Sequence, residues 1–340
     1  MSVIVPCRDE ERYIGPCLDS IIASDYPQER LEVLVADGRS RDGTRDIVTR
    51  YATQHVMIRL LDNPAQITPT GLNAGLRAAR GDVIMRMDAH VVYPPSYIPR
   101  LVAALLESGA DNVGGIIATL PADSTPVARA IAAALSHPFG VGTSYFRIGV
   151  GKRRWVDNVA FGCWRRETFS RIGLFDEAMI RNQDDEFNFR LLRAGGRVVL
   201  VPGIVSHYYA RASLRQLARM YFQYGYFKPL VAAKIGKVMT VRQLVPGLFT
   251  LTLLVLGLLA PWWEPGRVIA AAVLGVYLVG DLGSSLALAP RQGVGVALAA
   301  FATFPVLHLS YGLGFLRGTA ALLLRRGRPP ADPGSTPLSR

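Results

Sequence analysis

The sequence predicts an α/β fold, with a mostly parallel sheet covered by helices on both faces, followed by a helical region in a membrane. Two observations predict this. Up to about Ser206, short apolar runs alternate with helical patterns, as in a globular α/β protein. From Leu244 to Leu324 the chain is almost wholly apolar, which accounts for its 50% hydrophobic residues and mean hydropathy of +0.24.

Four apolar runs predict the first strands, at residues 3–5, 31–35, 56–61 and 83–87. Helical spacing predicts helices between them: one carries Ile14 and Leu18, one carries Ile47 and Val48, and one covers residues 70–79. Ser40 and Asp42 are placed to cap the second of these helices. Strands that alternate with helices at this pace should lie parallel and be joined by right-handed crossovers.

The next elements are predicted as a helix at 97–107, a strand at 114–119 and a short helix at 128–135. A further helix should cover residues 183–194, with Asn182 as its N-cap and Asp185 completing a capping-box-like pair. The last strand, residues 198–201, should end before His207.

After Ser213 the pattern is amphipathic, basic and aromatic, which favours helices at a membrane interface over residues 213–242. An ordinary surface helix is the alternative. Three apolar segments then follow, and each is near the ~20 residues that cross a bilayer as a helix. They cover residues 244–263, 268–289 and 294–316. The predicted organisation is therefore a globular domain at 1–212, interfacial helices at 213–242, transmembrane helices at 243–324 and a disordered basic tail at 325–340.

Within the apolar segments, Asp281 and His308 should face the bundle interior, and Gly314 with Gly318 forms a GxxxG packing pattern. Lysines and arginines at 228–242 place the start of the first span on the cytoplasmic side. Three spans would leave the arginines at 325–328 outside. Either a fourth, short or re-entrant piece exists around residues 318–324, or one segment does not cross fully.

The net charge of +12 indicates a polyanionic partner. Anionic lipid and a phosphorylated substrate explain it better than nucleic acid, because no nucleic-acid-reading element is present. Cys7, Cys17 and Cys163 form no metal or redox pattern, so we expect reduced thiols. The chain opens on a strand without a signal peptide, and we expect its first domain to be cytoplasmic.

Three acidic positions carry the candidate chemistry: Asp37, Asp88 with His90, and Asp184 at the start of a predicted helix. The first two follow strands, whose carboxyl ends meet in the crevice of an open sheet. Asp37 could accept hydrogen bonds from a nucleotide, or it could simply belong to a turn. The Asp88 carboxylate and the imidazole two residues later suit Mg²⁺ or Mn²⁺ bridged by a diphosphate.

Asp184, Asp185 and Glu186 lie in the first turn of their helix, where the helix dipole favours acids in any protein. Glu186 can pair with Arg190 one turn later as structural support. Asp184 is then the better candidate for a base that takes a proton from an attacking hydroxyl.

Four motifs occur in order and together resemble a family 2 glycosyltransferase of GT-A fold. They are the segments at 3–11, 37–44, 86–90 and 182–190. The Asp-Ala-His form, with the membrane tail, is similar to succinoglycan-type ExoA glycosyltransferases. The resemblance covers roughly residues 1–230.

The resemblance implies the following roles. Pro6, Glu10 and Asp37 would contact the uridine of a nucleotide-sugar, and Arg86 would bind substrate. Asp88 would hold metal and diphosphate, His90 stands at the second position of the metal motif, and His207 matches a further metal-ligand position. Asp184 would be the base of an inverting displacement. Phe161, Gly162 and Arg166 would form the acceptor side.

The implied cofactor is Mg²⁺ or Mn²⁺, and the implied partners are a nucleotide-sugar donor, a polyprenyl-diphosphate-linked saccharide acceptor and membrane lipids. The implied location is the inner (plasma) membrane, as a multi-pass protein with a cytoplasmic catalytic domain. Two departures matter. His90 replaces an aspartate, which leaves direct metal ligation there open. The QxxRW motif of processive synthases is absent, since Gln216 to Met220 lacks the Trp, so single-sugar addition is favoured.

Other functions fit less well. A dinucleotide oxidoreductase would carry GxGxxG after the first strand, where Pro6-Cys7-Arg8 stands. A nucleotidyltransferase would carry a glycine-rich phosphate loop. A processive polysaccharide synthase shares the first domain and is the nearest alternative. An inactive membrane scaffold or transporter subunit could keep the fold without the chemistry.

Overall fold

The protein is described from a computed structural model, which covers residues 1–236 and 240–324. The chain divides into two compact units. The first joins Met1–Ala118 to Tyr145–Tyr208, and the second joins Thr119–Ser144 to Tyr209–Arg340. The sequence predicts residues 1–212 as one continuous domain, whereas the structure assigns the stretch at 119–144 to the second unit. The predicted tail at 325–340 lies outside the described residues.

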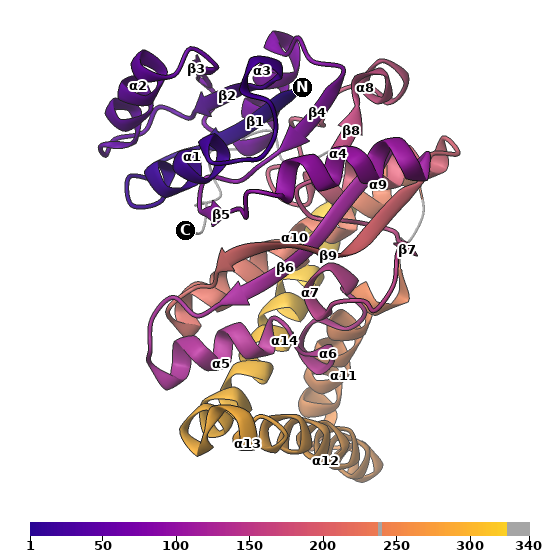
Figure 1. The fold of residues 1–340 in the computed structure, drawn as a ribbon. Helices are drawn as coiled ribbons and strands as arrows, with labels where there is room; N and C mark the ends of the chain where they lie inside the picture. Colours follow the sequence, from indigo (N-terminus) through magenta and orange to yellow (C-terminus); the bar gives the residue numbers. More distant parts are fainter. Residues whose placement is uncertain (237–239, 325–340) are drawn as a thin grey trace. The chain divides into compact units, whose positions relative to one another are not determined.

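The first unit is built on a nine-stranded sheet in the order β3-β2-β1-β4-β8-β6-β9-β5, with β7 paired to β9 (Figure 1). Its strands are β1 (Ser2–Cys7), β2 (Glu32–Asp37), β3 (Ile58–Asp62), β4 (Val83–Arg86), β5 (Val91–Val92), β6 (Asn112–Leu120), β7 (Arg154–Trp155), β8 (Cys163–Arg165) and β9 (Val198–Tyr209). The predicted parallel arrangement is found from β3 to β4. Antiparallel pairs then join β4 to β8, β8 to β6 and β9 to β5.

Helices cover both faces of this sheet, as predicted. They are α1 (Ile14–Ile22), α2 (Thr44–Gln54), α3 (Thr68–Ala78), α4 (Tyr97–Ser108), α7 (Tyr145–Ile148), α8 (Arg166–Ile172) and α9 (Gln183–Arg193), with a 3-10 turn η1 (Gln28–Arg30). On one face, Ile4 and Leu34 pack with Leu72 of α3 and Phe187 of α9. Their buried neighbour Val3 points to the opposite face, because successive strand residues alternate.

Three element predictions differ from the structure. The third strand begins at Ile58 rather than at Val56, whose side chain is 98% exposed. The last strand, β9, continues through His207 to Tyr209 because it pairs with β5. Asn182 precedes α9 as predicted, but it adopts a left-handed backbone conformation (φ 61°) and its side chain makes no capping hydrogen bond.

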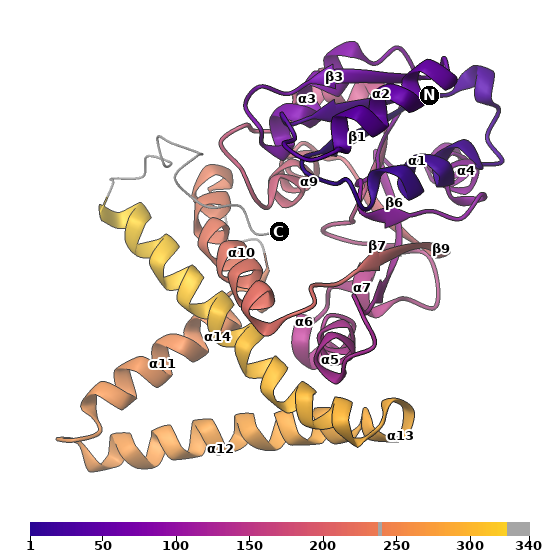
Figure 2. The ribbon, with the colours of Figure 1, turned by 90° about the vertical axis from the view of Figure 1, so that its left-hand side faces the viewer.

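The second unit is helical (Figure 2). Its helices are α5 (Pro126–Ala134), α6 (Pro138–Val141), α10 (Leu214–Ile235), α11 (Val245–Leu259), α12 (Glu264–Leu286), α13 (Ala289–Gln292) and α14 (Val294–Leu324), with a 3-10 turn η2 (Val241–Gln243). Three stretches are long and apolar enough to cross a membrane: Val241–Leu259, Glu264–Gln292 and Val294–Leu324. Residues 318–324 continue α14 and are not a separate fourth piece.

Glycines allow α10 and α14 to pack with their backbones in contact. A Cβ added at Gly314 or Gly318 would collide with the carbonyl oxygens of Phe222 and Tyr226 on α10. Gly225 is equally close to the Tyr311 carbonyl oxygen of α14. The GxxxG pattern therefore marks a real helix–helix contact, as predicted.

The two polar residues of the apolar segments are buried, also as predicted. Asp281 is fully buried and His308 is 9% exposed. The Nε2 of His308 donates to the Phe139 carbonyl oxygen of α6 at 2.9 Å, so its Nδ1 accepts from the Tyr277 hydroxyl at 2.9 Å. His308 thus joins α6, α12 and α14 within this unit.

Candidate active site

The carboxyl ends of β1 and β4 form the edge of the sheet where a ligand crevice is expected. These strands are neighbours, yet the chain leaves β1 towards β2 on its other side, so strand order reverses between them. Open α/β sheets bind ligands at such a switch point. β1 ends with Pro6 and Cys7, and Glu10 lies in the loop that follows the strand. Across the switch point, Glu10 Oε1 lies 3.3 Å from Nδ1 of His90, so the structure brings these two predicted residues together.

The loops after β1 and β2 are tied to each other at this edge. The Asp9 and Glu10 amides donate to the hydroxyls of Ser40 and Thr44, at 2.8 and 2.6 Å. The Asp9 carboxylate accepts from the amide of Arg41 at 2.7 Å. Each loop thus donates hydrogen bonds to the other, which fixes the two loops relative to each other.

Unusual backbone conformations gather in the loops of the first unit. Within residues 1–236 and 240–324, the non-glycine residues with positive φ are Asp9, Arg39, Gln66, Phe161 and Asn182. Three of them lie in the loops after β1, β2 and β3. Such conformations cost on the order of 1–3 kcal/mol each and concentrate at functional sites, where the surrounding structure holds them.

Asp37 is fully buried at the end of β2. Its carboxylate accepts from the Ser40 hydroxyl at 2.5 Å and pairs with Arg45 at 3.2 Å. Ser40 therefore orients Asp37 instead of capping α2. Asp42 accepts from the amide of Thr44, the first residue of α2, which keeps it structural.

Arg86 and Asp88 form a bidentate ion pair, with Nε–Oδ1 and Nη2–Oδ2 distances of 2.8 and 3.1 Å. Only 11% and 16% of the two side chains are exposed. Burial alone would raise the pKa of Asp88, but the charge and hydrogen bonds of Arg86 outweigh it, with smaller contributions from His90 and Arg181. The pKa of Asp88 therefore lies below its ordinary value.

Asp184 lies in the first turn of α9 and is half-buried. One carboxylate oxygen accepts from the Asp185 amide at 3.0 Å. Burial acts to lower the pKa of Arg86, but attraction to Asp88, with a smaller contribution from Asp184, raises it above its ordinary value. Asp88 and Asp184 thus both raise the pKa of Arg86, and Asp88 does so through direct hydrogen bonds.

The two acids after Asp184 are structural. Asp185 accepts from Asn158, which belongs to a buried chain of amides with Asn188 and Asn112. Asp185 therefore also has a partner in the protein interior. The pairing of Glu186 with Arg190 is confirmed, with distances of 2.8 and 2.9 Å.

The predicted acceptor segment is divided by the structure. The Gly162 carbonyl oxygen accepts from the Arg86 amide at 3.1 Å, and the Phe161 ring lies 6.3 Å from that of Tyr93. These two residues lie beside Arg86 and Tyr93. Arg166 does not, because β8 runs antiparallel to β4 and carries the chain to the opposite end of β4. The Arg166 amide binds the carbonyl oxygen of Asp82, before β4 begins.

The candidate metal ligands do not form a three-residue group. Among the described residues, no three His, Cys, Asp or Glu side chains are placed to hold a metal ion. His207 stands opposite Val92 in the β9–β5 pair, next to Tyr208, whose ring contacts that of His90. Asp88 and His90 still fit Mg²⁺ or Mn²⁺ as donors, because a carboxylate, an imidazole and diphosphate oxygens make an acceptable ligand set.

Several residues of the site do not stand out in the sequence. Tyr93 accepts from the Asp88 amide at 2.8 Å, and the Tyr208 ring lies 5.6 Å from that of His90. Arg45 forms an ion pair with Asp37, and the charge of Arg181 helps to lower the pKa of Asp88. The signal for both arginines is their adjacency to predicted motifs, since they directly follow Thr44 and precede Asn182.

Comparisons with known proteins show the family of the chain. The family model described as "Glycosyl transferase family 2" matches residues 2–173. The succinoglycan biosynthesis protein ExoA of Rhizobium meliloti is 33% identical over 321 residues, which cover 93% of each chain. A dolichyl N-acetyl-alpha-D-glucosaminyl phosphate 3-beta-D-2,3-diacetamido-2,3-dideoxy-beta-D-glucuronosyltransferase of Methanococcus voltae is 29% identical, covering 69% of this chain and 74% of that one.

A solved structure shares the fold. It is a mannosyltransferase from Pyrobaculum calidifontis, determined with GDP-mannose and Mn²⁺. The TM-score is 0.57 at 21% identity, and the match covers 94% of this chain and 86% of that one.

Proposed function

The chain belongs to the family 2 glycosyltransferases, and from this premise we propose that it adds a single sugar from a UDP-linked donor to a lipid-linked saccharide. The proposed reaction is inverting and metal-dependent, takes place at the cytoplasmic membrane face and serves exopolysaccharide or cell-surface glycan synthesis. The observation that carries the proposal is the bidentate ion pair of Arg86 and Asp88 at the carboxyl end of β4. The charge of Asp184 also acts on the Arg86 guanidinium.

The proposed donor site follows the carboxyl edge of the sheet. Pro6, Glu10 and Asp37 line the nucleotide end, where Ser40 and Arg45 orient the buried Asp37 carboxylate. Asp88 and His90 are the residues that would hold the cation. When bound, Mg²⁺ or Mn²⁺ neutralises charge on the departing diphosphate.

The proposed step is one displacement. The acceptor hydroxyl oxygen bonds to the anomeric carbon, its proton passes to the Asp184 carboxylate, and the bond from that carbon to the diphosphate oxygen breaks. The nucleoside diphosphate leaves with the electron pair, and the configuration inverts. Arg86 would stabilise the growing negative charge through its positive charge and its Nη1 donors, because Nε and Nη2 bind Asp88.

The acceptor is proposed from the relatives and the membrane helices. The Rhizobium relative acts in succinoglycan biosynthesis, and the Methanococcus relative is named for a dolichyl-linked sugar acceptor. A lipid-linked acceptor also explains why three apolar stretches accompany the catalytic unit. The absent QxxRW motif favours one sugar per acceptor, which the length of the product would test.

Nucleotide-sugar binding is the first test. We expect UDP-sugars with Mn²⁺ to raise the melting temperature of the purified full-length protein, and chelation of the metal to remove most of that shift. The rise follows because a ligand that binds only the folded state stabilises it, by about 2.7 kcal/mol at a hundred times its Kd. The proposal fails if no nucleotide-sugar gives a metal-dependent shift.

Replacing the base is the second test. Asp184→Asn should lower sugar transfer by about 10²–10⁴-fold, the range for loss of a general base, while UDP binding and the melting temperature stay near wild type. Glu167→Gln is the matched control, since Glu167 is an exposed acid in the first turn of α8. Equal activity of Asp184→Asn and the control would remove Asp184 from the mechanism.

A further inference from the structure

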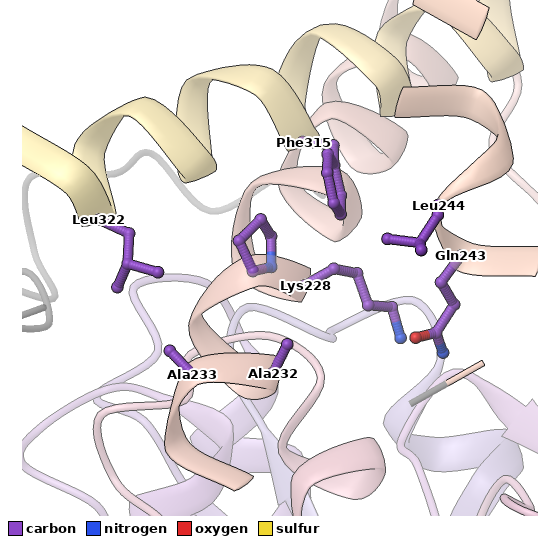
Figure 3. Close-up of a pocket in the computed structure, with 8 residues that line it drawn as sticks. Lys228, Ala232, Ala233, Gln243, Leu244, Phe315 and Leu322 are labelled. Atoms are coloured by element: carbon purple, nitrogen blue, oxygen red, sulfur yellow. The ribbon is translucent and has the colours of Figure 1, made fainter. Parts of the chain in front are cut away.

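A hollow of about 220 Å³ lies among three helices of the second unit (Figure 3). Its lining comes from the end of α10, the start of α11 with η2, and the last third of α14. The residues are Lys228, Pro229, Ala232, Ala233, Gln243, Leu244, Phe315 and Leu322. Six of these eight side chains are apolar, and Lys228 and Gln243 are the polar ones.

The hollow exists because the close contact between α10 and α14 ends there. Gly225, Gly314 and Gly318 hold the two backbones together one to two turns earlier. Beyond that point α10 presents Ala232 and Ala233, which are too small to fill the space towards Leu322. Figure 3 shows the side chain of Lys228 extending along the hollow towards Gln243.

The chemistry of the lining selects an amphipathic ligand. A dry cavity of about 150 Å³ can hold benzene, so this hollow has room for roughly nine or ten carbon atoms. The Pro229 and Phe315 rings and the Ala232 methyl offer no hydrogen bonds to a polar guest. The ammonium group of Lys228 favours an anionic group on the same molecule.

The place of the hollow in the chain points to a membrane ligand. It lies where α10 gives way to the first apolar stretch, Val241–Leu259. Basic residues flank this transition, among them Lys234 and Arg242. Such a boundary sits at the level of lipid phosphates, where a lysine near anionic lipid contributes about 1 kcal/mol.

We propose that this hollow binds the first isoprene units of a polyprenyl diphosphate, with Lys228 and Gln243 meeting the diphosphate. This inference rests on the proposed function, because it names the site that holds the lipid of the acceptor. Two isoprene units carry about the number of carbon atoms that the hollow accommodates.

Lipid binding by the full-length protein in detergent tests the proposal. Farnesyl diphosphate, farnesol and inorganic diphosphate would be compared as ligands by calorimetry, with phosphatidylglycerol as the acyl-chain alternative. We expect farnesyl diphosphate to bind at least tenfold more tightly than each of the other three. Equal binding of phosphatidylglycerol would overturn the proposal and make the hollow a general lipid contact.

Two variants and one control test whether binding takes place in the hollow. Ala232→Trp fills it and should weaken farnesyl diphosphate binding at least tenfold. Ala272→Trp, which adds the same bulk on an exposed position of α12, should not. Lys228→Gln removes only the charge. It should lower the affinity for farnesyl diphosphate to nearly the affinity for farnesol. If Ala232→Trp does not fold, Lys228→Gln decides; unchanged binding in Lys228→Gln, or in folded Ala232→Trp, rejects the proposal.

The donor assay separates this inference from the proposed function. The UDP-sugar shift reports on the first unit and does not need the lipid. A retained shift without selective farnesyl diphosphate binding would reject the lipid site alone. Loss of the shift with retained lipid binding would reject the sugar-transfer proposal instead.

Discussion

At the scale of single residues, the ion pair of Arg86 and Asp88 combines a structural and a chemical role. Both side chains are nearly buried, so each compensates the charge that the other brings into the protein interior. The sequence marks Asp88 through its place after a strand. It does not reveal the ion pair, because the two side chains meet only through the local path of the chain after β4. The same holds for Glu10 and His90, which are 80 residues apart and meet at the switch point.

Arg86→Met should destabilise the first unit by about 3 kcal/mol at pH 7, since it leaves a buried carboxylate without its partner. The pKa of Asp88 is lowered in the folded state, so its contribution to stability is present above its unfolded pKa of about 3.9 and is lost as pH falls through the folded value. Melting temperatures of wild type and variant should therefore converge in acid. Adding Asp88→Asn to Arg86→Met should recover part of the loss, and a pH-independent difference would contradict this explanation.

At the scale of elements, the sequence predicts best those that bury a regular apolar pattern. The strands β1, β2 and β4 and the helices α4 and α9 lie within one or two residues of their predicted bounds. β5, β7 and β8 are only two or three residues long, so no periodicity can show in them. These short strands also explain two differences from the sequence prediction. Pairing with β5 extends β9 past His207, and pairing of β8 with β4 carries Arg166 away from the site.

Glycine substitutions test the packing of α10 on α14. Gly314→Ala should destabilise the helical unit by about 2 kcal/mol, because its Cβ would press on the Phe222 carbonyl oxygen. Gly275→Ala on α12 is the matched control, since nothing lies within 4 Å of the added carbon. It should be neutral or stabilising by at most about 1 kcal/mol, as alanine is the better helix former. Thermal unfolding in detergent compares them, and equal stability of both variants would exclude a close contact at Gly314.

At the scale of the whole molecule, the membrane topology follows from what α14 contacts. This helix has 31 residues, about 46 Å at 1.5 Å per residue. Its first part packs on α5 through Val296 and Ala300, and its last part packs on α10 through Gly314. Only short links, residues 121–125 and 210–213, separate α5 and α10 from the sheet strands β6 and β9. We infer that a helix in contact with both stays on the same side of the membrane as α5 and α10.

We therefore expect α11 and α12 to cross the bilayer and α14 to remain on the cytoplasmic side with α5 and α10. This arrangement returns the chain to the side of Lys228 and Arg242, as the distribution of basic residues favours. A green fluorescent protein fused after residue 340 should fluoresce, and an alkaline phosphatase fused there should be inactive. A phosphatase inserted between α11 and α12 is the positive control. Active phosphatase at the C-terminus would mean that all three helices cross.

The contact between α5 and α14 also sets a condition on biosynthesis. Ala130 and Ala134 of α5 are buried by Val296, Ala300 and Phe304, which the ribosome adds more than 150 residues later. At about 5–20 residues per second, the apolar face of α5 waits roughly 10–30 s for its partner. During that interval the rest of the sheet is synthesised around an uncovered apolar helix. We expect a chaperone or the membrane surface to cover α5 until translation reaches α14.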